Sequence, residues 1–257
     1  MPDAVPKLVL LPGMDGTGEL FSDFIKALPR SFVTEIVRYP PNRCLSAQEL
    51  LHLLESVGHG SEPFVVVAES FSSPLAFQWA ATGPPNLKGL VICAGFATTP
   101  IQGPLRAILR LLSRFCFLVQ PPAIAIKLLL VGRDAPTSLV VAVRSAISSV
   151  RPEVLSGRLR IALTCDARLE LEKVTVPMLF IQPRQDRLVG LDRLEEMQRI
   201  RTSASAEIVS GPHLFIQRQP DKAAELVAKF ARHCIPPAKF YKKESQQETL
   251  HPWLNSY

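Results

Sequence analysis

Residues 65–73 constrain the fold of this chain more than any other stretch. Their sequence, VVVAESFSS, begins with β-branched residues that predict a strand buried on both faces, and it runs into SPLAFQWAA, which has a helical pattern. Ser70 therefore falls on the turn between a strand and a helix. Ala68 and Ser72 are small enough to let the strand and helix pass closely, as in a nucleophile elbow. The usual G-x-S-x-G pattern of that turn has become A-x-S-x-S here.

Strands and helices are predicted to alternate through most of the chain. A capping box of Ser46 and Glu49 opens one predicted helix, at 46–57, and apolar periodicity predicts another at 220–233. The predicted strands lie at 7–11, 32–39, 63–69, 87–96, 177–181 and 206–210. This alternation predicts an α/β fold with a doubly wound, mainly parallel sheet of six strands.

The alternation stops between residues 98 and 171. Three or four helices are expected there, at about 104–119, 123–131, 136–150 and 152–165. We therefore expect an α/β core formed by 1–97 and 172–235, a helical cap or lid insertion at 98–171, and a C-terminal tail at 236–257. Periodicity leaves open whether the apolar face of the first inserted helix packs against the core or lines a substrate pocket.

Three side chains with complementary chemistry follow predicted strands. A serine such as Ser70 needs a base to take its proton, and an imidazole base needs a carboxylate partner. Among the five histidines, His213 alone follows a strand at the expected edge, and Asp186 follows the strand at 177–181. Because ligands of doubly wound sheets bind beyond the carboxyl ends of the strands, these side chains are expected to meet there. Asp15 is the second candidate for the acid.

A glycine-rich loop, PGMDGTGELF, follows the first predicted strand. The spacing of Gly13, Gly16 and Gly18 matches neither the dinucleotide-binding nor the P-loop pattern, and no lysine follows. The better interpretation is a loop that directs backbone N–H groups at a developing oxyanion.

Over about residues 7–233, the chain resembles the α/β-hydrolase superfamily. The order Ser, Asp, His along the chain is the order in that superfamily. LPGMDGTGELF and AESFSSPLA are similar to bacterial carboxylesterases and to phytyl ester synthase-like acyltransferases with an LPG-x-DG-x-G loop. The resemblance implies a nucleophile at Ser70, an acid at Asp186, a base at His213 and oxyanion N–H donors at Met14 and Phe71. It also implies that the N-terminal antiparallel hairpin of the family is missing.

Composition restricts the class of partner. The chain has a formal charge of +6 and is 47% hydrophobic, but its basic residues are dispersed and lack interleaved aromatic side chains, so nucleic-acid binding is not expected. No stretch has the length of a transmembrane helix and no secretory signal is evident, which predicts a cytoplasmic protein. The five scattered cysteines indicate neither disulfides nor a metal site, and no cofactor is expected.

These observations predict a serine carboxylic-ester hydrolase that acts through an acyl-enzyme on short- to medium-chain acyl esters. An acyltransferase or thioesterase with the same triad is the nearest alternative, and a non-catalytic binding protein on this fold is the alternative of another class. An acidic acyl carrier is a conceivable partner for the arginines of the inserted helices, Arg158 among them, although a solvated face is favoured. Side chains expected to line the substrate pocket are Leu105, Leu109, Leu112 and Leu214.

Overall fold

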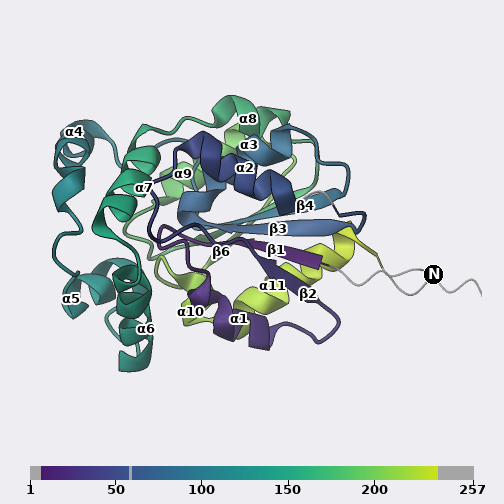
Figure 1. Ribbon diagram of the computed structural model, residues 1–257. Coiled ribbons are helices and arrows are strands. Elements are labelled where there is room, and N and C mark those ends of the chain that lie inside the picture. The colour runs from purple at the N-terminus through teal and green to yellow at the C-terminus, as the bar shows by residue number, and fades with distance from the viewer. Residues whose placement is uncertain (1–6, 58–59, 237–257) are drawn as a thin grey trace, which may run out of the picture.

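The computed structural model of the chain describes residues 7–57 and 60–236, and a single sheet organises them (Figure 1). Its six strands lie in the order β2-β1-β3-β4-β5-β6, and every neighbouring pair is parallel. The predicted α/β fold with a six-stranded parallel sheet is therefore confirmed. The strands are β1 (Lys7–Leu11), β2 (Val33–Ile36), β3 (Phe64–Glu69), β4 (Leu87–Cys93), β5 (Met178–Pro183) and β6 (Ser205–Val209).

Two strands end earlier than the sequence pattern predicts. β2 ends at Ile36 because the backbone N–H of Tyr39 leaves the sheet and donates to the carbonyl of Gly16, in the glycine-rich loop. β4 ends at Cys93 because Ala94 adopts a left-handed conformation with φ of 49°. At the end of β2, a connection to the glycine-rich loop thus replaces the regular ladder.

Helices cover both faces of the sheet (Figure 1). Successive residues of β3 alternate between the two cores: Val66 and Ala68 join one, and Val65 and Val67 join the other. The first core is covered by α2 (Ala47–Val57), α3 (Ser73–Ala81), α8 (Arg168–Lys173) and α9 (Leu191–Ile200), and the second by α1 (Ser22–Ala27), α10 (Phe215–Arg218) and α11 (Pro220–Cys234). The reciprocal hydrogen bonds of Ser46 and Glu49 form the predicted capping box of α2.

A group of helices between β4 and β5 lies at one end of the sheet (Figure 1). It contains α4 (Gly103–Leu112), η3 (Ser113–Phe115), α5 (Ala123–Ile126), the π-helical turn η4 (Lys127–Val131), α6 (Thr137–Ser148) and α7 (Pro152–Thr164). These elements are called the inserted helices below. Within the described residues, no helix combines the length and apolar character that crossing a membrane requires. The tail expected at 236–257 lies outside the described residues except for its first position.

Candidate active site

The turn between β3 and α3 lifts Ser70 out of the sheet. β3 ends at Glu69, and Ser70 takes a φ of 49°, in the left-handed region where a side chain is strained. Ala68 and Ser72 are fully buried, so their small size is what allows the strand and helix to approach. The hydroxyl of Ser73 donates to the carbonyl of Ser70 at 2.8 Å and holds the turn. The local geometry matches the elbow that the sequence predicts.

The structure brings Ser70, His213 and Asp186 together at the carboxyl ends of β3, β5 and β6. His213 Nε2 lies 2.9 Å from Ser70 Oγ, and His213 Nδ1 lies 2.7 Å from Asp186 Oδ2. The other carboxylate oxygen of Asp186 accepts hydrogen bonds from the backbone N–H groups of Leu188 and Val189, at 2.8 and 2.9 Å. Because both carboxylate oxygens are held, the imidazole is oriented with Nε2 toward the serine.

His213 and Asp186 are almost completely shielded from solvent, with side-chain exposures of 5% and 1%. Burial alone lowers the pKa of His213, but the charge of Asp186, its hydrogen bond and the nearby charge of Glu69 more than offset this, so the pKa is raised above its ordinary value. The imidazolium form is therefore stabilised, as a base that takes a proton from a serine requires.

Glu69, the residue before Ser70, is a buried carboxyl group that sequence analysis did not single out. It is 2% exposed, and its Oε2 accepts a hydrogen bond of 3.1 Å from the side-chain amide of Gln217 on α10. Its Oε1 has no hydrogen-bond partner among the described residues. Burial raises the pKa of Glu69 to about 7. Glu69 is therefore a second titrating group beside the imidazole.

Arg158 of α7 holds the glycine-rich loop through hydrogen bonds to its backbone. Its guanidinium donates to the carbonyls of Met14 and Asp15, at 3.0 and 2.6 Å, and to that of Pro40 at 3.0 Å. Arg158 is 3% exposed, so the prediction that it belongs to a solvated face is wrong. Gly16 has a φ of 70°, and any side chain there would collide with this guanidinium. Charge counts could not find this role, because α7 meets the loop only in the folded chain.

Ser72 connects the elbow to the same loop. Its hydroxyl donates to the carbonyl of Pro12 and shares a hydrogen bond of 2.7 Å with the hydroxyl of Tyr39. Ser72 stands where the G-x-S-x-G pattern has its second glycine, and a glycine could form neither bond. The departure from that pattern thus ties Ser70 to the loop that carries Met14.

An apolar cavity of about 230 Å³ adjoins Ser70 and His213. Met14 and Asp15 border it, and so does Leu214, which was expected to line a substrate pocket. Much of the remaining wall comes from the inserted helices and the turns between them, through Phe117, Pro121, Ala125, Ile126, Leu129, Leu130, Val143, Ile147 and Leu155.

The other leucines expected at the pocket lie elsewhere. Leu105, Leu109 and Leu112 belong to α4 and are absent from the lining of this cavity. Leu105 and Leu112 are 53% and 45% exposed. Helical periodicity identified an apolar face correctly, but that face is turned to solvent.

Asp15, the second candidate for the acid, has a different role in the structure. Its Oδ2 accepts hydrogen bonds from the N–H and hydroxyl of Thr17, at 2.9 and 2.6 Å, and so shapes the glycine-rich loop. Phe71, the second residue implied as an oxyanion donor, is buried in the first turn after Ser70. Met14 and Phe71 therefore lie on the two segments that Ser72 connects.

No protein-family model and no curated protein sequence matches the chain. Solved structures match it over most of their length. A bromoperoxidase from Bacillus anthracis has a TM-score of 0.76 at 13% identity, over 90% of this chain and 93% of that one. A thermophilic esterase from Thermogutta terrifontis has a TM-score of 0.73 at 17% identity, with 91% and 92% covered. An alpha/beta hydrolase, MGS-M2, from a Medee basin deep-sea metagenome library has 0.69 at 18% identity, with 88% and 89% covered.

The strand order, the elbow and these matches define the class: the chain has the α/β-hydrolase fold. Matches at this level of identity define a fold, and the activity of this chain has to be argued from its own site.

Proposed function

We propose that the protein is a serine carboxylic-ester hydrolase. The observation that carries the proposal is the chain of hydrogen bonds from Ser70 Oγ through His213 to Asp186, beginning at a strained serine that borders an apolar cavity. A hydroxyl held 2.9 Å from an imidazole with a raised pKa has the base it needs to act as a nucleophile.

The reaction proceeds through an acyl-enzyme. Ser70 Oγ forms a bond to the ester carbonyl carbon while its proton passes to His213 Nε2. The C–O bond to the alcohol then breaks, and the departing alcohol takes that proton. Water repeats the sequence on the acyl-Ser70 ester, with His213 again as base, and releases the carboxylic acid.

We assign stabilisation of the tetrahedral oxyanion to the backbone N–H groups of Met14 and Phe71. The clamp formed by Arg158 and the bridge formed by Ser72 support this assignment, because both hold the loop of Met14 against the elbow. Loss of one oxyanion donor typically raises the barrier by about 3 kcal/mol, so the position of this loop has a large effect on rate.

The apolar wall of the cavity supports an acyl chain as the group bound beside Ser70. Its volume of about 230 Å³ suits short and medium chains. Esterases among the matched structures agree with this choice of reaction class.

Covalent labelling by a fluorophosphonate, combined with turnover of p-nitrophenyl esters, tests the proposal. We expect labelling and turnover in the natural chain, and loss of both in Ser70→Ala. The control is Ser148→Ala, because Ser148 is an exposed serine on α6 that bonds only within its own helix. A folded natural chain that neither labels nor turns over any ester would leave a binding protein as the better description. Turnover restricted to carrier-bound thioesters would indicate a thioesterase or acyltransferase.

A further inference from the structure

Residues 98–152, which contain most of the inserted helices, combine exposed apolar side chains with positive charge. Of the thirteen large apolar side chains that are exposed in the described residues, nine lie between Leu105 and Leu129. Residues 98–152 contain seven basic residues and one acidic residue, Asp134. Asp134 forms an ion pair of 2.6 Å with Arg218 of α10, so its negative charge is already matched by an arginine. The outer part of the segment is therefore both apolar and basic.

Helix α4 is turned the opposite way from an ordinary surface helix. Its apolar residues lie on one side, and Arg106 lies on the other, where its Nε donates to the carbonyl of Leu163 in α7 at 2.8 Å. Ile108 and Phe115 are each 51% exposed and Leu111 is 76% exposed, and no residue of α4 is buried. A surface helix normally buries its apolar side against the core. The outward apolar side of α4 is therefore expected to bind a partner that shields it from water.

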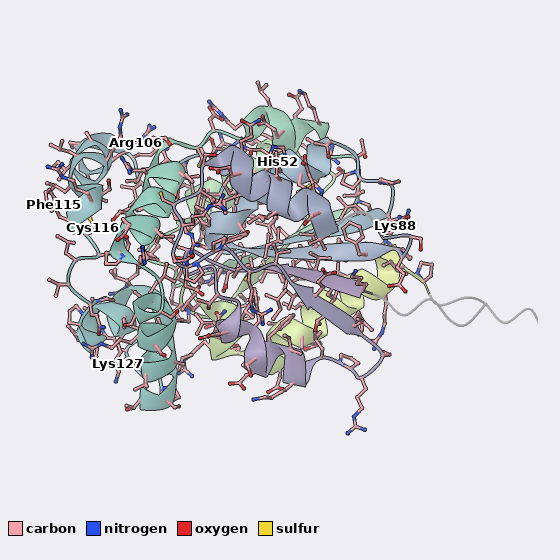
Figure 2. All side chains as sticks on the ribbon, viewed as in Figure 1. His52, Lys88, Arg106, Phe115, Cys116 and Lys127 are labelled. Atoms are coloured by element: carbon pink, nitrogen blue, oxygen red, sulfur yellow. The ribbon has the colours of Figure 1, made fainter. Side chains whose placement is uncertain are left out.

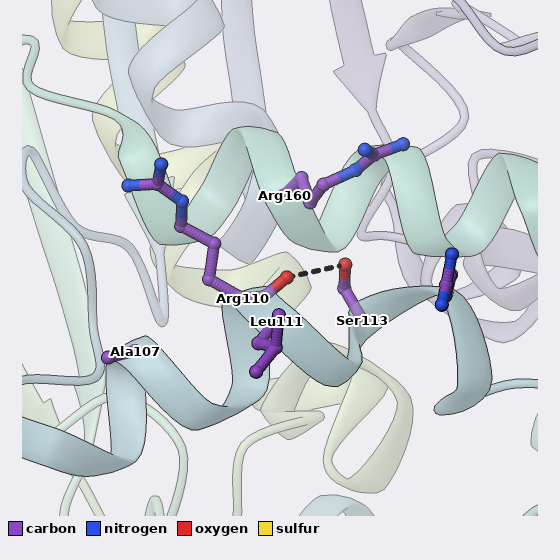
Figure 3. Close-up of a pocket in the computed structure, with 6 residues that line it drawn as sticks. Ala107, Arg110, Leu111, Ser113 and Arg160 are labelled. Carbon is purple, nitrogen blue, oxygen red and sulfur yellow. Dashed lines mark hydrogen bonds between the residues drawn. The ribbon is translucent and has the colours of Figure 1, made fainter.

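Three arginines lie where α4–η3 faces α7, next to Leu111 of the apolar side (Figure 3). Arg110, Arg114 and Arg160 line a pocket of about 570 Å³ between α4–η3 and α7 (Figure 3). The guanidinium of Arg114 lies 4.6 Å from the centre of the Phe115 ring. In the part of the chain that the structure describes, none of the three forms an ion pair with a carboxylate. Their charge is available to an anionic partner.

We propose that this apolar side, with the turns that follow it, docks on a phospholipid bilayer that carries anionic headgroups. The docking face consists of Leu105, Ile108, Leu111, Leu112, Phe115, Leu118, Val119 and Ile124. Helices that lie in a membrane interface combine such apolar side chains, which enter the acyl boundary, with basic side chains that meet the phosphates.

The position of the docking face fits a bilayer better than a protein. The inserted helices form one end of the molecule, and Phe115 lies at its outer edge (Figures 1 and 2). A bilayer deforms around a protruding helix and needs no matching groove. A second copy of the chain, related by a two-fold axis, would bring the same arginines against one another.

The docking face borders the candidate active site. Phe117, which lies in the chain between Phe115 and Leu118 of the docking face, lines the cavity beside Ser70. Leu129, outside that face, lines the same cavity and is 42% exposed. An acyl ester held in the bilayer would thus reach Ser70 without crossing water. This last step rests on the proposed ester hydrolysis, whereas docking itself does not.

Sedimentation with vesicles tests the docking. The natural chain is expected to bind vesicles of phosphatidylcholine with phosphatidylglycerol, and to bind phosphatidylcholine alone at least about tenfold more weakly, since each basic residue near an anionic surface contributes about fivefold. Leu111→Glu/Phe115→Glu is expected to abolish binding. Its matched control is Val33→Glu/Leu169→Glu, at exposed apolar positions away from the docking face, which is expected to bind as the natural chain does.

A second pair of variants isolates the charge. Arg110→Gln/Arg114→Gln is expected to lower binding to anionic vesicles by more than about tenfold, and Lys222→Gln/Lys229→Gln on α11 to leave it unchanged. Circular dichroism and turnover of a water-soluble ester report folding and catalysis separately, so failure of ester hydrolysis does not affect this test.

Three results would overturn the proposal. One is a natural chain that stays in the supernatant with both kinds of vesicle. Another is equal binding by the Leu111→Glu/Phe115→Glu variant and its control. The third is a dimer, detected without lipid by sedimentation velocity, that Leu111→Glu dissociates, because a second copy would then be the cover.

Discussion

At the scale of single residues, the electrostatics of the site depend on the burial of its charged groups. His213 and Asp186 are almost fully buried, and the carboxylate is further fixed by two backbone N–H groups. In such surroundings the Asp186 charge acts on the imidazole with little screening. The raised pKa of His213 follows from this contact, and it determines the pH at which the base becomes available.

We expect kcat/KM for a short p-nitrophenyl ester to fall as the pH is lowered, with a midpoint above about 6.5, the ordinary pKa of histidine. Below that midpoint Nε2 is protonated and cannot accept the Ser70 proton. A pH-rate profile of the natural chain checks this, and a flat profile between about pH 5 and 8 would exclude His213 as the base.

Asp186→Asn is expected to reduce kcat about 10⁴-fold, because the imidazole loses its partner and its tautomer. The pH-rate profile of this variant, compared with that of the natural chain, checks the loss.

At the scale of elements, helix α7 acts on the site although none of its side chains belongs to the proposed triad. Arg158 reaches the glycine-rich loop and the connection after β2, and three backbone carbonyls share its guanidinium. The guanidinium is a rigid planar group with five donors, which suits it to carbonyls from separate segments. The helix therefore sets the position of the loop that carries the Met14 N–H.

Replacement of Arg158 tests this link. Arg158→Met is expected to lower kcat for short esters about 10²-fold, because a displacement of about 1 Å at the oxyanion loop has an effect of that size. KM is expected to change much less, since the acyl cavity keeps its walls. Arg160→Met, two residues further along α7 and exposed, is the matched control and should retain kcat. The thermal stability of each variant is measured alongside its kinetics. If kcat falls only in proportion to the fraction of unfolded protein, Arg158 does not act by positioning the oxyanion loop.

Helix α5 contributes to the wall of the cavity. Ala125 lines it, whereas Ala123 on the same helix is exposed and does not. Ala125→Phe is therefore expected to shift the preference among p-nitrophenyl esters toward shorter acyl chains. Each methylene that no longer fits is expected to lower kcat/KM about tenfold or more, and acetate is expected to be nearly unaffected. Ala123→Phe is expected to keep the natural profile, and an unchanged profile in Ala125→Phe would place the acyl chain elsewhere.

At the scale of the whole molecule, local pattern predicted the positions of the six strands and of the inserted helices along the chain, because buried strands and apolar periodicity leave direct signals. Ser70, Asp186 and His213 could be placed at one edge since each lies within four residues of the end of a strand. Arg158 could not be found in this way: its partners lie 118–144 residues away in the chain. The exposed side of α4 was equally hidden, because a helical pattern does not say which side faces the core.

Ser72 shows the same limit at closer range. As a small residue it satisfies the steric need of the elbow, and that much follows from the sequence pattern. Its bonds to Tyr39 and Pro12 depend on how β1, β2 and β3 lie side by side in the sheet.

Glu69 makes the stability of the whole molecule depend on pH. Its pKa is raised by burial from an ordinary value of 4.5 to about 7. The folded chain therefore binds this proton more tightly than the unfolded chain does. The resulting stabilisation is complete below about pH 4.5, declines as the pH rises and is lost above about pH 7, a difference on the order of 3 kcal/mol.

Glu69→Gln separates this contribution from the rest, because the amide has the same shape and stays neutral. The free energy of unfolding in urea is measured for both proteins at pH 5 and at pH 8. The value for the variant minus the value for the natural chain is expected to be about 3 kcal/mol larger at pH 8 than at pH 5. His213 titrates in both proteins, and its pKa, which the charge of Glu69 helps to raise, is expected to be lower in the variant. A stability difference that is the same at both pH values would mean that Glu69 keeps its charge inside the fold, with a partner other than Gln217 to compensate it.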